Sequence, residues 1–247
     1  AVKANYTLSI VKVFLREGLW VETFTGPELH IAQLAGANPN KIILTGHNRS
    51  EKEFREALEA RVGLIVIDSL TELERLEKIA KEIGQDAKVL IRVNPEISVP
   101  THPMIATGVK GTKFGIDIQS GNAYKTYETA FEMDRVKVVG VHIHIGSQIL
   151  TFQPFIDAAK CIVDFVLTLN DRLGFKPEFI DLGGGFGIPY KPEEYDRRFN
   201  FDLLAKELSN IFCDLEPVGI KLPTLIFESG RNLVGDAEII LSRIGSI

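Results

Sequence analysis

The stretch LIVIDSLTELERLEKIAKEIGQDAKVLIRV, residues 64–93, contains one complete strand–helix–strand unit. Its two ends, LIVID (64–68) and KVLIRV (88–93), are short β-rich apolar runs, which are typical of buried parallel strands. Between them, SLTELERLEKIAKEIG (69–84) opens with a serine followed by a glutamate three residues on, and its apolar residues recur at spacings of three and four. This pattern predicts an amphipathic helix between two strands, which is the repeating unit of an α/β protein.

The same alternation continues along the chain. SEKEFREALEA (50–60) carries the same serine and glutamate signal and predicts a second amphipathic helix. The β-rich runs number eight: AVKA (1–4), WVETFT (20–25), KIILT (41–45), LIVID (64–68), KVLIRV (88–93), VKVVGVHIHI (136–145), FIDLGG (179–184) and TLIFES (224–229). Eight strands with helices between them in 247 residues predict a (β/α)8 TIM-like barrel. Because no linker or repeat interrupts the pattern, we expect residues 1–247 to form one barrel domain.

Composition narrows the classes of function. The net charge of -5 and the pI near 5.6, without a basic stripe, argue against nucleic acid as a partner. No apolar run approaches the roughly 20 residues that span a bilayer, so we expect no membrane role. Cys161 and Cys213 lie in separate predicted helices without metal-ligand or disulfide spacing. We therefore expect two buried thiols in a reducing, cytoplasmic compartment.

Polar residues gather at the ends of the predicted strands, where a barrel of this kind carries its active site. They are Lys3, Asn5, Asp68, Arg92, Asn94, His144, Gly183–Gly185, Glu228 and Arg231. Each also has a purely structural interpretation: Asp68 could cap the next helix, Asn94 could turn the chain with Pro95, and the glycines could form a tight turn. Their joint placement favours a functional site.

Four motifs in fixed order resemble the fold-type III pyridoxal-phosphate-dependent decarboxylases: AVKAN (1–5), HIHIGSQ (142–148), DLGGGFGIPY (181–190) and ESGR (228–231). TGHNRSEKEFREAL (45–58) and THPMIATGVKGTKFGI (101–116) extend the resemblance over essentially the whole chain. The resemblance implies a barrel of the alanine racemase and decarboxylase type with pyridoxal 5'-phosphate as cofactor. It also implies that Lys3 forms the Schiff base with that cofactor.

The residue types suit this chemistry. A pyridoxal aldehyde needs a lysine amine, and an apolar strand end would help to keep Lys3 deprotonated. A carboxylate beside the pyridine nitrogen holds the proton that makes the ring an electron sink. Glu228 is the strand-end candidate, and the resemblance implies the same role.

The cofactor phosphate needs backbone N–H groups that can approach closely, which glycine permits. Gly184 and Gly185 suit this need, and similar enzymes add a hydroxyl at the position of Ser147. Gly230 belongs to the same predicted cofactor site. Arg231 is a cation either for the phosphate or for a substrate carboxylate, and the sequence leaves both open.

The two histidines of HIHIGSQ point to one side of a strand, and such a pair can indicate a metal. No carboxylate or cysteine stands at ligand spacing beside them in the sequence, so we predict no metal. The resemblance implies that His144 stacks on the cofactor ring, whereas we expect His142 to be a structural histidine with satisfied hydrogen bonds. Asp68 and Arg92 are predicted to support the cofactor site from behind the residues that touch it.

Among the substrates of the family, Gln148 favours meso-diaminopimelate, which would yield L-lysine and carbon dioxide, over ornithine or arginine. Three alternatives stay open. They are a decarboxylase of another basic amino acid, a non-catalytic single-domain carrier of pyridoxal phosphate, and a Schiff-base aldolase, which would leave Glu228 without a purpose.

Two features depart from the family pattern. Ser229 stands where the family usually has proline, so the turn before Arg231 is expected to be less rigid. Relatives continue into a β-rich second domain, and EIILSRIGSI (238–247) alternates like a strand leaving the barrel. We therefore expect the full-length protein to be a homodimer and these residues alone to lack decarboxylase activity.

Overall fold

Parallel strands in chain order form the wall of the fold. The computed structural model describes residues 1–97, 114–192, 195, 199–237, 243 and 245. The motif residues 101–113, and all but two residues of the predicted last strand over 238–247, lie outside this part. The strands that pair in sequence are β1 (Val21–Thr23), β2 (Ile42–Leu44), β3 (Leu64–Ile67), β4 (Ala87–Asn94), β6 (Val136–His142), β7 (Phe179–Asp181) and β8 (Thr224–Ile226). The short strand β5 (Ile116–Asp117) pairs with β4 beside this path.

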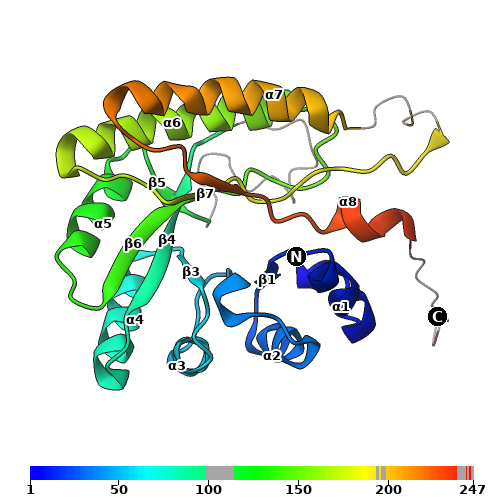
Figure 1. Ribbon diagram of the computed structural model, residues 1–247, viewed down its shortest axis with the longest axis horizontal. Helices are drawn as coiled ribbons and strands as arrows, with labels where there is room; N and C mark the ends of the chain where they lie inside the picture. Colours follow the sequence, from blue (N-terminus) through cyan, green and yellow to red (C-terminus); the bar gives the residue numbers. More distant parts are fainter. Residues whose placement is uncertain (98–113, 193–194, 196–198, 238–242, 244, 246–247) are drawn as a thin grey trace.

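Helices connect successive strands and cover the outside of the wall (Figure 1). The α-helices are α1 (Leu8–Arg16), α2 (Gly26–Ala35), α3 (Glu51–Glu59), α4 (Leu70–Ile83), α5 (Asn122–Phe131), α6 (Gln153–Leu173), α7 (Phe201–Phe212) and α8 (Arg231–Val234). Short 3-10 helices are η1 (Val2–Ala4), η2 (Pro39–Lys41), η5 (Cys213–Val218) and η6 (Gly235–Ala237). None of the described helices combines the length and the apolar character that crossing a bilayer requires.

The two helices predicted from serine and glutamate signals are confirmed. Ser50 and Glu53 form a complete capping box at the start of α3, and Ser69 accepts a hydrogen bond from the Glu72 amide at the start of α4. The Glu72 carboxylate is used differently, since it accepts hydrogen bonds from the backbone N–H groups of Arg49 and Asp68. It therefore ties the start of α4 to the loop that follows β2.

Seven of the eight predicted strands are present, and the prediction for AVKA (1–4) is wrong. Residues Val2–Ala4 form η1, in which the Ala4 amide donates to the Ala1 carbonyl at 3.2 Å. A segment of three residues satisfies its backbone locally in a 3-10 turn more easily than by a strand ladder. Lys3 consequently stands on a 3-10 turn rather than on a strand end.

The expectation of two buried thiols is wrong for Cys213. This residue opens η5 directly after α7 and is exposed, whereas Cys161 lies in α6 and is partly buried. The end of a helix leaves its next residues on the surface, which the apolar pattern of α7 does not reveal.

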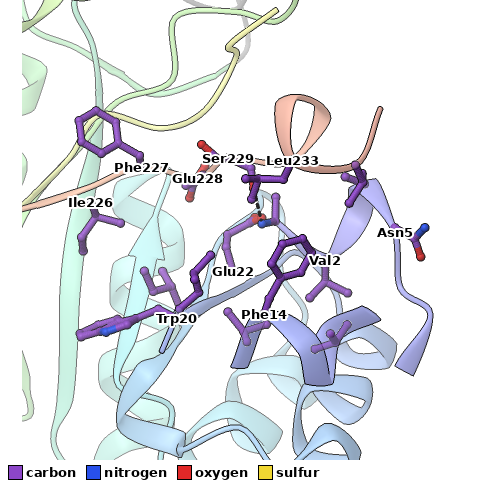
Figure 2. A pocket seen from close by; sticks show the side chains of 18 residues that line it. Val2, Asn5, Phe14, Trp20, Glu22, Ile226, Phe227, Glu228, Ser229 and Leu233 are labelled. Carbon is purple, nitrogen blue, oxygen red and sulfur yellow. Dashed lines mark hydrogen bonds between the residues drawn. The ribbon is translucent and has the colours of Figure 1, made fainter. Parts of the chain in front are cut away.

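The wall has an open seam between its first and last strands. In the described part of the chain, pairing runs as one path from β1 to β8, and no ladder joins these two strands to each other. A pocket of about 140 Å³ lies there instead, lined by residues of both edges, including Trp20, Glu22, Ile226 and Phe227 (Figure 2). The seam brings the start of the chain next to its last strand, because the Ala1 ammonium donates to the Ser229 carbonyl at 2.9 Å.

Two layers of side chains fill the inside of the wall. The lower layer is apolar and contains the buried residues Ile43, Leu64, Val66, Leu90 and Val139. Side chains two residues apart on a strand share one side, so Thr45 and Arg92 follow Ile43 and Leu90 at the C-terminal ends of β2 and β4. The upper, polar layer consists of the buried residues Glu22, Thr45, Arg92, His142, Asp181 and Glu228.

Candidate active site

One open cavity of about 640 Å³ brings together most of the predicted site residues. It lies above the polar layer at the C-terminal ends of the strands. The predicted residues that line it are Lys3, His144, Ser147, Gly185, Glu228, Gly230 and Arg231. Segments from the beginning, middle and end of the chain therefore meet at one place, as the strand order predicts.

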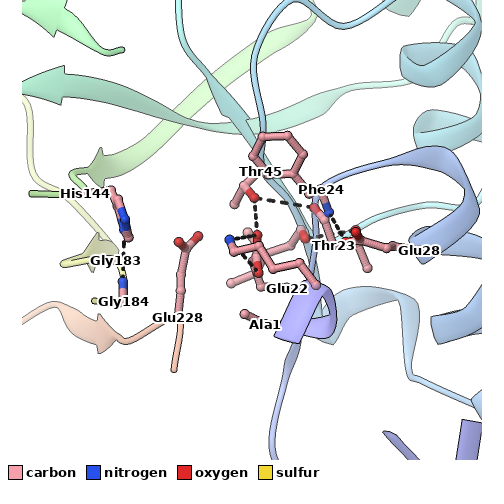
Figure 3. Close-up of polar contacts among 12 residues, drawn as sticks. Ala1, Glu22, Thr23, Phe24, Glu28, Thr45, His144, Gly183, Gly184 and Glu228 are labelled. Carbon is pink, nitrogen blue, oxygen red and sulfur yellow. Dashed lines mark hydrogen bonds and ion pairs between the residues drawn. The ribbon is translucent and has the colours of Figure 1, made fainter. Parts of the chain in front are cut away.

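Lys3 is held by a carboxylate that comes from β1. Its Nζ lies 3.2 Å from Glu22 Oε1 and 3.4 Å from Glu22 Oε2 (Figure 3). The Lys3 side chain is 46% exposed toward the cavity, whereas that of Glu22 is 4% exposed. Glu22 also accepts a short hydrogen bond from the Thr45 hydroxyl.

The charge of Lys3 differs from the prediction. Burial lowers the pKa of Lys3, but Glu22, with help from Glu228, outweighs this effect and raises the pKa above its ordinary value. The expectation that an apolar environment keeps this amine deprotonated is therefore wrong. The group that faces the cavity is an ammonium at neutral pH.

Glu228 follows β8 and reaches back into the polar layer. Its Oε1 lies 3.3 Å from His142 Nε2, and both side chains are almost completely buried. Burial acts to raise the pKa of Glu228, but His142, which is hydrogen-bonded to it, and the ammonium of Lys3 outweigh this effect, and the pKa falls well below its usual range. Glu228 is thus an ionised carboxylate that stands between His144 and Glu22 (Figure 3).

Asp181 ends β7 beside these residues. It is the register partner of His142 and is fully buried, and its Oδ1 accepts a hydrogen bond from the Gly183 amide at 2.8 Å. Burial and the charge of Glu228 raise the pKa of Asp181 well above its ordinary value. Ligand-type atoms of His142, Asp181 and Glu228 all lie within 4.8 Å of one another.

This cluster changes the basis of the metal prediction. The sequence argument relied on the lack of a carboxylate near the two histidines, but the fold places two carboxyl groups next to His142. The expectation that His142 has satisfied hydrogen bonds is also wrong in part. Its Nδ1 is buried and has no hydrogen-bond partner among the described residues.

His144 is neutral. Burial, and then the charge of Arg92, lower its pKa to about 3. Its Nδ1 accepts a hydrogen bond from the Gly184 amide at 3.3 Å. An imidazole in this state is a flat uncharged ring, and it lines the same cavity as Lys3.

The glycine run after β7 passes close to two neighbouring backbones. A Cβ at Gly184 would lie 2.3 Å from the Glu228 carbonyl, and one at Gly185, where φ is +100°, would lie 2.2 Å from the Gly146 carbonyl. Only glycine fits at these positions. The run thereby fixes the loops that carry Ser147 and Glu228 against each other.

Arg231, at the start of α8, connects three parts of the cavity wall. One guanidinium nitrogen donates to the Ser147 hydroxyl at 3.4 Å, and another donates a short hydrogen bond to the Tyr190 hydroxyl. These contacts place a cation beside a hydroxyl and the glycine loop, which is a suitable set of donors for a phosphate or a carboxylate.

Asp68 and Arg92, which were predicted to support the cofactor site, do not line the cavity. Asp68 Oδ1 accepts a hydrogen bond from the Gly115 amide at 2.8 Å and lies 3.6 Å from Arg92 Nε.

The Gln148 side chain forms hydrogen bonds within the protein. Its amide group donates to the Ile188 carbonyl and accepts from the Ile188 N–H. Gln148 therefore fixes a loop, and its side chain does not line the cavity.

Sequence reasoning missed four residues of this region: Glu22, Thr45, Asp181 and Tyr190. The signal for Glu22 was the same as for Lys3, namely one charge within an apolar β-rich run. Asp181 stands two residues before the first glycine of the run, where a carboxylate is typical of a turn residue. Neither Thr45 nor Tyr190 differs from an ordinary strand-end or loop residue.

A lysine ammonium, a neutral histidine and an ionised glutamate around one cavity of an α/β barrel define the class of site that binds pyridoxal phosphate. Comparison with known proteins agrees with this class. The family model described as pyridoxal-dependent decarboxylase, pyridoxal binding domain, matches residues 1–235. The chain belongs to this family and has its α/β barrel.

Similar curated relatives include diaminopimelate decarboxylases. That of Methanocaldococcus jannaschii is 38% identical over 100% of this chain and 56% of its own length, and that of Aquifex aeolicus is 37% identical over 99% and 56%. The solved M. jannaschii enzyme superposes with a TM-score of 0.84 at 37% identity, covering 94% of this chain and 53% of that one. The Helicobacter pylori enzyme, solved with L-lysine, gives 0.84 at 32% identity, covering 94% and 56%. The chain thus spans about half the length of the relatives that it matches.

Proposed function

We propose that the protein containing this chain decarboxylates meso-diaminopimelate to L-lysine and carbon dioxide, with pyridoxal phosphate as cofactor. The observation that carries the proposal is the convergence of Lys3, His144 and Glu228 on one cavity beside an anion-binding set of donors. The names of the relatives support the choice of substrate, as does the L-lysine bound in a solved relative.

The residues present fit the cofactor. Lys3 offers the amine for the aldehyde, and Ser147, Gly185, Gly230 and Arg231 line the part of the cavity suited to the phosphate. When bound, pyridoxal phosphate would supply an electron sink for the pair of electrons left when a substrate carboxylate departs as carbon dioxide.

Glu228 and His144 would act on the ring of the cofactor. Because Glu228 is ionised, it can accept a hydrogen bond from a protonated ring nitrogen and hold that proton in place. The neutral imidazole of His144 can lie against the ring without competing for that negative charge. Burial of Glu228 keeps water away from the same atoms.

Lys3 needs a partner that takes its proton before the amine can act as a nucleophile. Glu22 Oε1, 3.2 Å from Lys3 Nζ, is within reach of that proton. Glu22 can therefore hold Lys3 as an ammonium before the cofactor binds and accept a proton from it when the amine reacts.

A substrate panel on the intact protein tests the proposal. With pyridoxal phosphate present, carbon dioxide release is measured for meso-diaminopimelate, ornithine, arginine and lysine. We expect kcat/KM for meso-diaminopimelate to exceed the others at least about tenfold, a difference of about 1.4 kcal/mol in transition-state binding. Preference for ornithine or arginine would assign the protein to another basic amino acid, and cofactor binding without any release would make it a carrier.

A further inference from the structure

We propose that His142 and Asp181 are positioning residues for Glu228. In this arrangement Asp181 is the uncharged acid, His142 is the bridging imidazole, and Glu228 carries the single negative charge of the three. The inference rests on the proposed function in one respect, namely that Glu228 faces the ring nitrogen of the cofactor.

The strand register brings the three side chains together. His142 and Asp181 are direct partners in the β6–β7 pair, and Asp181 is in turn the partner of Ile226 in β8. Glu228 follows two residues after Ile226 and therefore returns to the same side of the wall. Adjacent elements thus fix all three groups, and the exposed fractions of His142, Asp181 and Glu228 are 1%, 0% and 7%.

The unpartnered atoms of the cluster show how many protons it holds. If His142 Nε2 donates to Glu228, then His142 Nδ1 is a bare acceptor, and it is buried without a partner among the described residues. Asp181 Oδ2 is likewise buried without a hydrogen-bond partner among the described residues. An ionised Asp181 would add a second buried negative charge next to Glu228 with one oxygen unsatisfied, which is costly. One proton on Asp181 removes that charge and turns a bare acceptor into a donor within a cluster whose ligand-type atoms all lie within 4.8 Å of one another.

The charged groups around the cluster favour the same distribution. The hydrogen bond from His142 in β6 and the ammonium of Lys3 in η1 favour a negative Glu228. Glu22 from β1 and Glu228 itself oppose a negative charge on Asp181, while Lys3 and the Gly183 amide favour it. Arg92 from β4 acts on His144 and thereby helps to keep that imidazole neutral. The net result is an ionised Glu228 that is hydrogen-bonded to His142 and lies beside an uncharged Asp181.

Infrared spectroscopy of the cofactor-free intact protein tests the proton on Asp181 without relying on any activity. We expect the wild type to show the stretch of a protonated carboxyl group at pH 7 to 8, where ordinary carboxyl groups are ionised. Asp181→Asn should remove this band, and Glu228→Gln should leave it. Absence of the band in the wild type, or its persistence in Asp181→Asn, would overturn the assignment.

The pH dependence of the bound cofactor's visible spectrum tests the role of His142. His142→Leu removes the donor to Glu228, so the spectral transition that follows Glu228 protonation should move upward by about one pH unit or more. His142→Gln, which keeps an N–H donor, should restore it toward the wild-type position, and turnover of His142→Leu should fall on the order of 10- to 100-fold. An unchanged midpoint in His142→Leu would contradict the role.

The two proposals can fail separately. A panel without carbon dioxide release would remove the proposed reaction, while the infrared band in the cofactor-free protein would still report the proton on Asp181. If His142→Leu does not fold, the wild-type band at pH 7 to 8 keeps the inference testable.

Discussion

Two buried glutamates stand at the two edges of the barrel wall, and their partners differ in kind. Glu22 lies in β1 and receives a hydroxyl from Thr45 and an ammonium from Lys3. Glu228 follows β8 and receives an imidazole from His142. The same side chain at the same level of the barrel therefore controls a lysine on one edge and holds a negative charge of its own on the other (Figure 3).

The difference shows that burial alone does not set the charge of a group. Burial raises the pKa of both Asp181 and Glu228, yet Glu228 ends below its usual range and Asp181 above it. The imidazole on Glu228 accounts for the contrast, because among the described residues the Asp181 side chain accepts a hydrogen bond from the Gly183 amide alone. Variants on the two edges should therefore have different consequences.

Loss of Lys3 should have the largest effect. Lys3→Ala removes the amine for the cofactor aldehyde, so turnover in the intact protein should fall on the order of 10³ or more, while phosphate contacts through Ser147 and Arg231 still retain the cofactor. Borohydride reduction followed by peptide mapping should label the peptide with Lys3 in the wild type and none in the variant. Lys12→Ala, which alters an exposed lysine of α1, is the matched control. A label on another lysine would remove Lys3 from this role.

Removing the charge of each glutamate in turn compares the two edges directly. Glu228→Gln should lower the turnover number on the order of 10² because the ring nitrogen loses the partner that holds its proton. Glu22→Gln should act on Lys3 instead. Since Glu22 raises the pKa of Lys3, its loss lowers that pKa, and covalent capture of pyridoxal phosphate by the cofactor-free protein should reach its half-maximal rate at a lower pH.

The pH profile of capture is measured by the change in absorbance on mixing. The same pair also affects folding. The Lys3–Glu22 ion pair stabilises the folded state below the ordinary lysine pKa, and this stabilisation is lost as the pH rises through the raised pKa of Lys3. Equal capture profiles in wild type and Glu22→Gln would contradict the division of labour between the edges, as would an unchanged turnover number in Glu228→Gln.

The smallest effect is expected from the hydroxyl that supports Glu22. Thr45→Val keeps the shape of the side chain but leaves the buried Glu22 carboxylate without one donor, so the free energy of unfolding should fall by about 1.5–3 kcal/mol. Thr23→Val is the matched control, because the Thr23 hydroxyl donates at 3.2 Å to the neutral Ile43 carbonyl and should contribute about 1 kcal/mol. Chemical denaturation of the intact proteins measures both, and equal losses would show that the charge on Glu22 is not what Thr45 supports.

The sequence predicted the barrel well because its signals are local. Each βα unit has an apolar run, a serine cap and a helical repeat within about 30 residues, and β3, α4 and β4 formed where these signals stand. The prediction of a strand around Lys3 was wrong for a physical reason. Whether three residues form a strand depends on a pairing partner that lies far along the chain. The strand β5 was not predicted, because two residues are too few to show an alternation of apolar and polar side chains.

The site was predicted where a residue stands at the end of a predicted strand and within a motif that resembles the family. Lys3, His144, Glu228 and Arg231 were found in this way, and the structure brings them to one cavity. The protonation states were not predictable from the sequence. That of Lys3 depends on Glu22, and that of Glu228 depends on His142, which is 86 positions away in the chain.

The contact between Ala1 and Ser229 at the open seam has a consequence for the order of folding. Neighbouring strands of the wall are close in sequence, so they can pair one after another through short loops, whereas this contact closes a loop of 228 residues. We therefore expect the cavity that joins Lys3 to Glu228 to assemble late and to open early. A ligand bound there connects the two ends of the chain and stabilises the folded state as its concentration rises above its Kd. Withdrawing pyridoxal phosphate should accordingly speed amide hydrogen exchange at η1, β1 and β8 before it affects β3 and β4.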